Sequence, residues 1–171
     1  FEAASRLRPD LGETLNNRAQ ALLSLGRTAE AIEVAEAAAA ASPAMAILRF
    51  NLANIYAAVG RTADAERVLL ALLSDNPADV TVRARRADML VGLGRFDEAA
   101  AQYRMVIERS PGNAAAWNNR GVCLLRLGRA SEAITCLTRA LELNPRLEDA
   151  ARNLEAIRRA TPQPGSPVRA P

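Results

Sequence analysis

The sequence predicts an all-α fold built from repeated antiparallel helix hairpins, and three observations predict it. Five prolines follow one another at steps of 34 residues, and four glycines repeat the same step. A fixed period of this length is typical of repeat architectures. Apolar residues recur at three- and four-residue spacing on both sides of each glycine, which is the spacing of helices and not of strands. Aromatic residues make up only 4% of a chain rich in alanine, which favours helices that approach one another closely. The phased residues are Pro9, Pro43, Pro77, Pro111 and Pro145, and Gly26, Gly60, Gly94 and Gly128.

The period divides the chain into hairpin units and two end segments. Residues 1–11 are expected to be the remnant of a preceding repeat, its second helix. Four units follow, and a terminal helix that shields the last unit from solvent is expected after them. The final segment holds four prolines and a glycine, which predicts a disordered, proline-rich tail. The four units are residues 12–45, 46–79, 80–113 and 114–147, the terminal helix is residues 148–160, and the tail is residues 161–171.

Within each unit, the glycine and the proline predict where the helices end. Glycine between two helical runs supplies the positive φ that ends the first helix and starts a tight turn. Proline ends the second helix, because it pushes the residue before it out of the α region. The residue before each proline is a suitable N-cap, so we expect it to cap the next helix, with the proline just inside that helix. These expected caps are Ser42, Asn76, Ser110 and Asn144.

The columns of the aligned units resemble the tetratricopeptide repeat, a family with this period and a Trp, Leu-Gly, Tyr, Ala, Phe, Pro signature. The fourth unit carries the signature best, with Trp117, Gly121, Leu124, Ala133 and Pro145. The resemblance covers roughly residues 1–160, Phe1 and Ala4 included, and it implies a right-handed superhelical solenoid with a concave groove for protein ligands. Arginines depart from the family's apolar columns, and we expect their stems to cover apolar surface while their heads reach solvent or a carboxylate. They are Arg49 and Arg83 in the tryptophan column, and Arg18, Arg86 and Arg120 in the leucine column.

Composition argues against several classes of function. The chain has no histidine, so it lacks the commonest general base and the commonest metal ligand. We therefore predict no enzyme activity, no metal and no cofactor. The recurring acids Glu30, Asp64, Glu98 and Glu132 are expected on a solvated helix face beside arginines, and Cys123 and Cys136 are expected to pack as small apolar residues. A redox pair is the alternative for the two cysteines.

Neither nucleic acid nor a membrane is an expected partner. No apolar run approaches 18 residues, which predicts no membrane span. The net charge is only +3, and acidic residues flank the one dense arginine cluster, so no basic stripe for nucleic acid is present. All 22 cationic residues are arginine, which suggests a GC-rich, bacterial genome. The chain begins with Phe1, so we leave the compartment open, with the cytoplasm favoured.

By resemblance, the first helix of each unit faces the groove, and asparagines recur on it. An amide offers a donor and an acceptor, which matches the two groups of a peptide bond, so a row of amides can hold an extended peptide by its backbone. The alternative is that these amides bond to local backbone groups or face water. Phe50 is expected either to be an apolar anchor or to be tucked against its neighbour repeat. Arg85 is expected to pair with an acidic side chain or a peptide C-terminus. The lysines of the family's carboxylate clamp are missing, since Asn16 and Thr81 stand in their places. The predicted groove residues are Asn16, Asn17, Phe50, Asn51, Asn54, Arg85, Asn118, Asn119 and Arg126.

We therefore expect a scaffold that binds an extended peptide or a partner protein in the groove. Two alternatives stay open. The array can be the substrate-recruiting arm of a larger enzyme, such as a glycosyl- or sulfotransferase. It can also self-assemble into homo-oligomers through its solenoid ends, which expose apolar faces unless they are capped.

Overall fold

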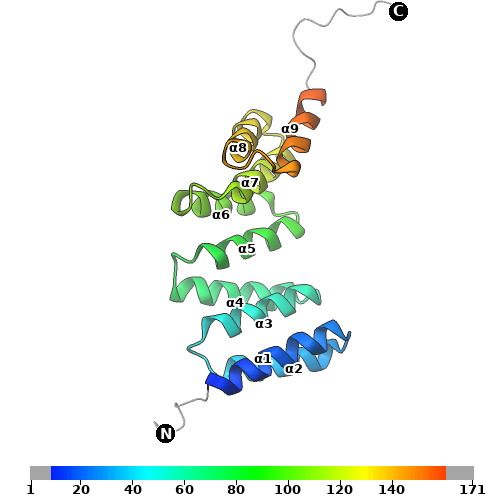
Figure 1. The fold of residues 1–171 in the computed structure, drawn as a ribbon, viewed down its shortest axis with the longest axis vertical. Coiled ribbons are helices and arrows are strands. Elements are labelled where there is room, and N and C mark those ends of the chain that lie inside the picture. Colours follow the sequence, from blue (N-terminus) through cyan, green and yellow to red (C-terminus); the bar gives the residue numbers. More distant parts are fainter. Residues whose placement is uncertain (1–8, 161–171) are drawn as a thin grey trace, which may run out of the picture. The chain divides into compact units, whose positions relative to one another are not determined.

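A computed structural model describes residues 9–160, and all secondary structure within that range is helical (Figure 1). The segments expected to be the preceding helix (1–8) and the tail (161–171) lie outside the described residues. The helices are α1 (Pro9–Ser24), α2 (Thr28–Ala41), α3 (Ala46–Ala58), α4 (Thr62–Asp75), α5 (Val80–Gly92), α6 (Phe96–Arg109), α7 (Ala114–Arg126), α8 (Ala130–Leu143) and α9 (Glu148–Ala160).

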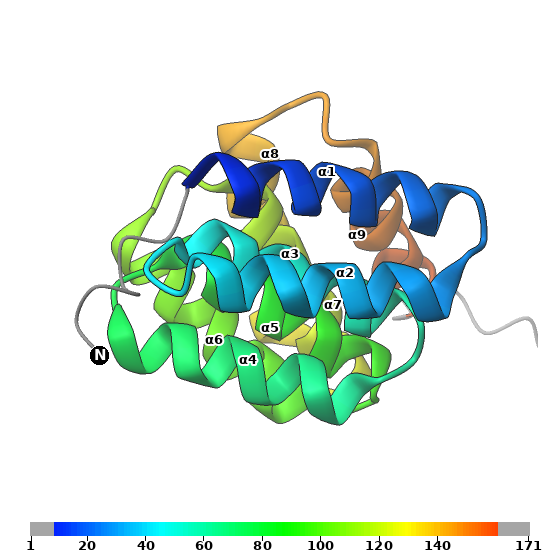
Figure 2. The same ribbon diagram turned by 90° about the horizontal axis from the view of Figure 1, so that it is seen from below.

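The chain divides into two compact units, Phe1–Val82 and Arg83–Pro171. In the first unit, α1 pairs with α2 and α3 pairs with α4, while α3 also packs against α1 and α2. Figure 2 shows α1 and α2 lying side by side along their lengths. In the second unit, α7 packs against α6 and α8, and α9 packs against α8 and touches α7. Residues 9–11 belong to α1, so the first described hairpin starts before residue 12.

The four phased glycines turn the chain between the helices of a hairpin. Gly26, Gly60, Gly94 and Gly128 have φ values of 73°, 80°, 72° and 74°. The backbone N–H of the next residue then bonds back to the first helix, as Arg27 does to the carbonyl of Leu22 at 2.9 Å. A left-handed residue at this place satisfies carbonyls that the helix end would leave unpaired. The expected glycine turns are confirmed.

The expectation that Ser42, Asn76, Ser110 and Asn144 cap the next helix is wrong. Each is the C-cap of the helix before it, and the next helix starts four residues later, so the proline lies in the connecting turn. In that turn the N–H of Met45 bonds to the carbonyl of Ser42 at 3.0 Å. The chain uses two residues between the C-cap of one helix, such as Ser42, and the N-cap of the next, such as Met45, to reverse its direction. The N-cap therefore lies after the proline. Asn113 occupies this later position, and its side chain accepts a bond from the N–H of Ala116 at 3.0 Å.

Small and branched apolar side chains fill the interior of each unit. In the second unit, one cluster joins α7, α8 and α9 through Leu124, Leu137, Ala150 and Leu154. Cys123 and Cys136 are buried free thiols, as expected. None of the described helices is long and apolar enough to cross a membrane.

Arginine–carboxylate pairs recur beside the glycine turns. Arg27 pairs with Glu30, and the same pair repeats at Arg61–Asp64, Arg95–Glu98 and Arg129–Glu132, with N–O distances of 2.5 to 2.6 Å. The hydrogen bond from the arginine lowers the pKa of each acid. These pairs are exposed, so the expected solvated face is confirmed.

The arginines of the leucine column lie near the same acids. Arg18, Arg86 and Arg120 lower the pKa values of Glu30, Glu98 and Glu132 further through their charge. The remaining unit has Leu52 in that column, and its acid is the shorter Asp64, which pairs with Arg67 as well as with Arg61. Arginine in this column therefore accompanies glutamate in the acidic column.

The two arginines of the tryptophan column also find polar partners. Arg49 pairs with the carboxylate of Asp75 at 2.7 Å. Arg83 is buried and donates from Nη1 to Oε1 of Gln102 at 2.9 Å. In the fourth unit, Trp117 donates from Nε1 to the carbonyl of Pro111 at 3.0 Å.

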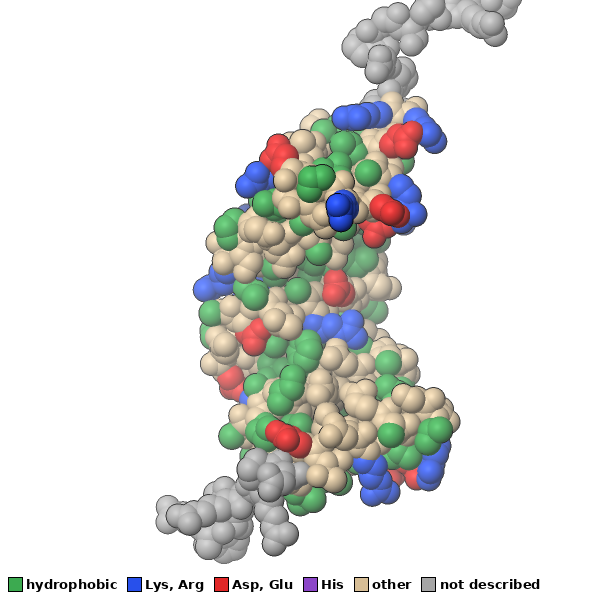
Figure 3. Space-filling model, viewed as in Figure 1, with side chains coloured by type: hydrophobic (Ala, Val, Ile, Leu, Met, Phe, Trp, Pro, Cys, Tyr) green, Lys and Arg blue, Asp and Glu red, His purple; other side chains and the backbone are tan. Residues whose placement is uncertain are grey.

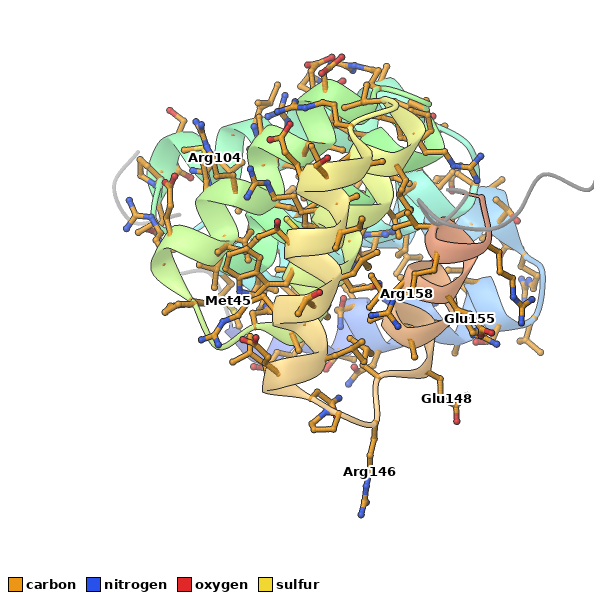
Figure 4. The ribbon with its side chains drawn as sticks, turned by 90° about the horizontal axis from the view of Figure 1, so that it is seen from above. Met45, Arg104, Arg146, Glu148, Glu155 and Arg158 are labelled. Atoms are coloured by element: carbon orange, nitrogen blue, oxygen red, sulfur yellow. The ribbon has the colours of Figure 1, made fainter. Side chains whose placement is uncertain are left out.

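Charged side chains of α9 face outward, since its apolar face packs on α8. Figure 3 shows arginine and acidic side chains next to one another over this helix. Arg152 pairs with Asp149 and Arg159 with Glu155. In Figure 4, Arg146 projects from the loop between α8 and α9, away from the ribbon.

Candidate peptide-binding surface

The predicted groove residues all lie on the first helices of their hairpins, as the alignment requires. They fall into two groups, one in each compact unit. In the first unit, Asn16 and Asn17 lie on α1, and Phe50, Asn51 and Asn54 lie on α3. In the second unit, Arg85 lies on α5, and Asn118, Asn119 and Arg126 lie on α7.

Asparagine side chains link neighbouring first helices in both units. Asn51 donates from Nδ2 to Oδ1 of Asn16 at 3.0 Å, which joins α3 to α1. Asn153 donates from Nδ2 to Oδ1 of Asn118 at 3.3 Å, which joins α9 to α7. Both pairs are separated by 35 residues, one more than the repeat. The phased amides therefore bond to one another across the repeat.

Asn118 and Asn119 are adjacent in sequence but differ in exposure. Asn118 is only 7% exposed, and it donates to Oδ1 of Asn119 at 3.0 Å. Asn119 is partly exposed and lines a pocket. Asn118 thus bonds to α9 and to its neighbour, whereas Asn119 accepts the bond from Asn118 and lines the pocket.

Phe50 lies in an apolar pocket of the first unit. This pocket has a volume of about 290 Å³, and α3 forms one wall of it. Ile47 is 55% exposed there, one turn before Phe50. Asp79 also lines the pocket, and its Oδ1 accepts the backbone N–H groups of Thr81 and Val82 at 2.9 and 3.0 Å. The pocket is lined by Ala46, Ile47, Phe50, Asp79, Thr81 and Val82.

A second pocket, of about 170 Å³, lies among α5, α6 and α7 in the second unit. Tyr103 of α6 is 2% exposed, and its hydroxyl donates to Oδ1 of Asp88 on α5. Asn119 of α7 donates from Nδ2 to that same hydroxyl oxygen at 3.3 Å. Burial and the bond to Asp88 raise the pKa of Tyr103, so the hydroxyl stays protonated as a donor. The pocket is lined by Asp88, Val91, Tyr103, Asn119 and Val122.

Sequence reasoning missed Val91 and Tyr103, and it left Asp88 and Val122 out of the predicted site. Asp88 and Val122 share a groove column with Gln20 and Asn54, so their position was visible. Tyr103 lies on a second helix, where the family signature expects a core aromatic. Its buried ring is a core feature, and only the structure shows its hydroxyl reaching the first helices.

The other tyrosine of the hairpins is tied to a second helix. Tyr56 of α3 donates to Oε1 of Glu36 on α2 at 2.6 Å. The guanidinium of Arg61 lies 4.5 Å from its ring centroid, a cation–π contact. Burial and the bond to Glu36 raise the pKa of Tyr56 to about 12. This hydroxyl joins α3 to α2 of the preceding hairpin and does not line either pocket.

The chemistry of these surfaces suits binding. Among residues 9–160, no group of three histidine, cysteine or acidic side chains is placed to hold a metal ion. Burial raises the pKa of the Cys123 thiol to about 11, and it also raises that of Cys136, so neither is an activated nucleophile. The two pockets offer apolar walls, the amide of Asn119 and the exposed carboxylate of Asp88.

A sequence profile described as the tetratricopeptide repeat matches residues 1–46, 50–114 and 84–148. Among solved structures, the chain is similar to MamA from Desulfovibrio magneticus, with 18% identity and a TM-score of 0.78 over 88% of this chain and 85% of that one. It is also similar to PilF of Pseudomonas aeruginosa, with 16% identity and a TM-score of 0.76 over 88% of this chain and 69% of that one.

A third similar structure is the first tetratricopeptide domain of Spaghetti bound to an HSP90 peptide. Its identity is 23% and its TM-score 0.64, over 67% of this chain and 91% of that one. At these sequence identities, the similarity to the three structures shows a shared fold. No curated protein sequence matches the chain.

Proposed function

Since this chain belongs to the tetratricopeptide repeat family, we propose that it binds an extended segment of a partner protein along its first helices. The observation that carries the proposal is that each compact unit has a pocket lined by first-helix residues. Proteins of this family are typically non-catalytic scaffolds. The peptide-bound Spaghetti domain, which has the same fold, supports this mode of binding.

In the first unit, the pocket around Phe50 suits an apolar side chain of the ligand. Ile47 and Phe50 are both at least partly exposed on α3, and an apolar side chain between them would leave water. Burying apolar area is the main source of affinity in such anchors.

The asparagines have a more limited role in the proposal than a continuous row of amides would give them. Asn17 is exposed, and Asn54 and Asn119 are partly exposed, so we assign these three to the ligand backbone. Asn119 bonds to Asn118 and Tyr103 and keeps one amide hydrogen for the ligand. Asn16, Asn51 and Asn118 bond to other asparagines, so we assign them to holding the helices in register. Arg85 and Arg126 remain candidates for acidic groups of the ligand.

A display selection tests the proposal without a known partner. Random twelve-residue peptides are selected against the full chain, and the enriched ones are measured by fluorescence anisotropy. Ile47→Glu is expected to weaken binding strongly, because it puts a charge into the apolar pocket. The matched control is Leu70→Glu, which changes a side chain 45% exposed on α4, outside both pockets.

Two outcomes contradict the proposal. One is that no peptide is enriched above the background of an unrelated helical protein. The other is that Ile47→Glu and Leu70→Glu weaken binding equally while circular dichroism shows both folded. Either result directs attention to self-assembly or to a role as the arm of a larger enzyme.

A further inference from the structure

The carboxylate of Asp88 is held in a fixed orientation at the mouth of the second pocket. The hydroxyl of Tyr103 has one hydrogen, and it donates that hydrogen to Oδ1 of Asp88. The amide of Asn119 donates to the oxygen of the same hydroxyl, which leaves the hydroxyl hydrogen directed at Asp88. Tyr103 is almost fully buried, so packing around its ring fixes the position of this hydroxyl.

Asp88 accepts a bond from a hydroxyl, whereas the phased acids of this unit accept from arginine, although Arg85 lies one turn before Asp88 on α5. Glu98 and Glu132, in the same unit, each form an ion pair with an arginine. Oδ1 of Asp88 accepts the hydroxyl of Tyr103. Its side chain is exposed, so the remaining acceptor positions face the pocket and solvent. This carboxylate is available to an external cation.

The walls of the pocket suit the stem of a long cationic side chain. Val91 and Val122 supply apolar surface next to Asp88, and the volume is about 170 Å³. Lysine and arginine cover apolar surface with their methylene stems while their charged heads reach a carboxylate. An acidic side chain would instead meet the charge of Asp88, at a site where the described lining residues include no cation.

We infer that this pocket receives a lysine or arginine side chain of the bound peptide, with Asp88 pairing with its charge and Val91 and Val122 covering its stem. The inference rests on the proposed function, since it names what one position of the peptide must carry. In the column of Asp88, the other units have Gln20, Asn54 and Val122. Asp88 is the one acid of this column, so we expect the column to select one basic position of the peptide.

A double-mutant cycle tests the inference with peptides from the display selection. The protein variant is Asp88→Asn, which keeps an acceptor for Tyr103 and removes the charge. The matched control is Asp97→Asn, an exposed acid of α6 that does not line the pocket. On the peptide side, the basic residue is replaced by norleucine, which keeps the stem and removes the charge. The peptide change needs no altered protein, so it remains informative if Asp88→Asn fails to fold.

We expect the selected peptides to share a lysine or arginine at one position. Norleucine there should weaken binding to the wild-type chain about ten-fold, the loss of one charge-assisted bond. The Asp88→Asn chain should bind both peptides equally, while Asp97→Asn should behave like the wild type.

Three results overturn the inference but leave the proposed function standing. They are enriched peptides without a shared basic position, an unchanged affinity with norleucine, and an equal loss for both peptides on Asp88→Asn. By contrast, failure to enrich any peptide counts against the proposed function itself, so the two failures are distinguishable.

Discussion

Asn51 donates a hydrogen bond to the side-chain oxygen of Asn16, 3.0 Å away on the neighbouring hairpin. The equivalent bond, from Asn153 to Asn118, joins the terminal helix α9 to α7. Asparagine is a mediocre helix former, so its recurrence inside helices needs a compensating interaction. These bonds supply one, and they make the phased amides part of the scaffold as well as part of its surface.

Replacing Asn118 should therefore cost stability. Asn118→Ala removes a buried side chain that bonds to Asn119 and Asn153, and we expect the free energy of unfolding to fall by about 1–2 kcal/mol. Asn17→Ala changes an exposed side chain and should shift it by less than about 0.5 kcal/mol. Urea unfolding followed by circular dichroism measures both. Equal effects would show that the inter-helix amide bond contributes nothing.

Replacing two glycines by alanine, one at the end of α5 and one two residues after it, should change stability in opposite directions. Gly94 has φ of +72°, so Gly94→Ala is strained and should destabilise the chain by about 1–2 kcal/mol. Gly92 is the last residue of α5, it has no such φ, and nothing lies within 4 Å of an added Cβ. Gly92→Ala should stabilise by about 0.5 kcal/mol, since alanine favours helix. Thermal unfolding of both variants gives the sign directly, and a shift in the same direction would refute this account of the turn.

The pKa of Glu132, the phased acid of the fourth unit, should depend on the two arginines near it. The hydrogen bond from Arg129 lowers the pKa of Glu132 from its ordinary value of 4.5, and the charge of Arg120 lowers it further. Because the folded pKa is depressed, the pair contributes stability above pH 4.5, and that contribution is lost as the pH falls through the folded value. Carboxyl NMR titration should show the pKa of Glu132 rising in Arg129→Gln, and rising less in Arg120→Leu. The reverse order would mean that the hydrogen bond is not the main cause.

The two cysteines should be inert in the folded chain. Burial raises the pKa of Cys123 to about 11 and raises that of Cys136, so both thiols remain neutral at pH 8 and are shielded from solvent. Reaction with Ellman's reagent at pH 8 should be slow until urea unfolds the chain, and two thiols should then react together. Rapid labelling of one thiol in the native chain would contradict its burial.

The period, the helices and the glycine turns follow from the sequence because each depends on local chemistry. Gly94 shows this, since only glycine adopts its conformation without strain. The helix starts were predicted less well, because Ser42 and Pro43 fit both an N-cap and a C-cap when read locally. The distance needed to reverse the chain selects the C-cap, and spacing alone does not contain that distance.

For the candidate site, the sequence predicts which helices and which columns of the aligned units carry the residues, and nothing finer. The columns place Asn119 and Asp88 on first helices, but they do not separate an amide that bonds to its neighbour from one that faces a ligand. Asn118 and Asn119 are identical residues side by side, yet Asn118 is buried and bonds to Asn153 of α9, whereas Asn119 is partly exposed. Tyr103 was missed because a buried ring in a core column gives no sign of where its hydroxyl points.

An amide NMR titration of the isotopically labelled chain with its tightest selected peptide tests the central claim most directly. The account predicts changes along α1, α3, α5 and α7, including the side-chain amides of Asn17, Asn54 and Asn119. Residues on the second helices that lie outside both pockets, such as Leu70 and Arg104, should keep their positions. Changes confined to the second helices or to α9, with those three amides unmoved, would contradict binding along the first helices.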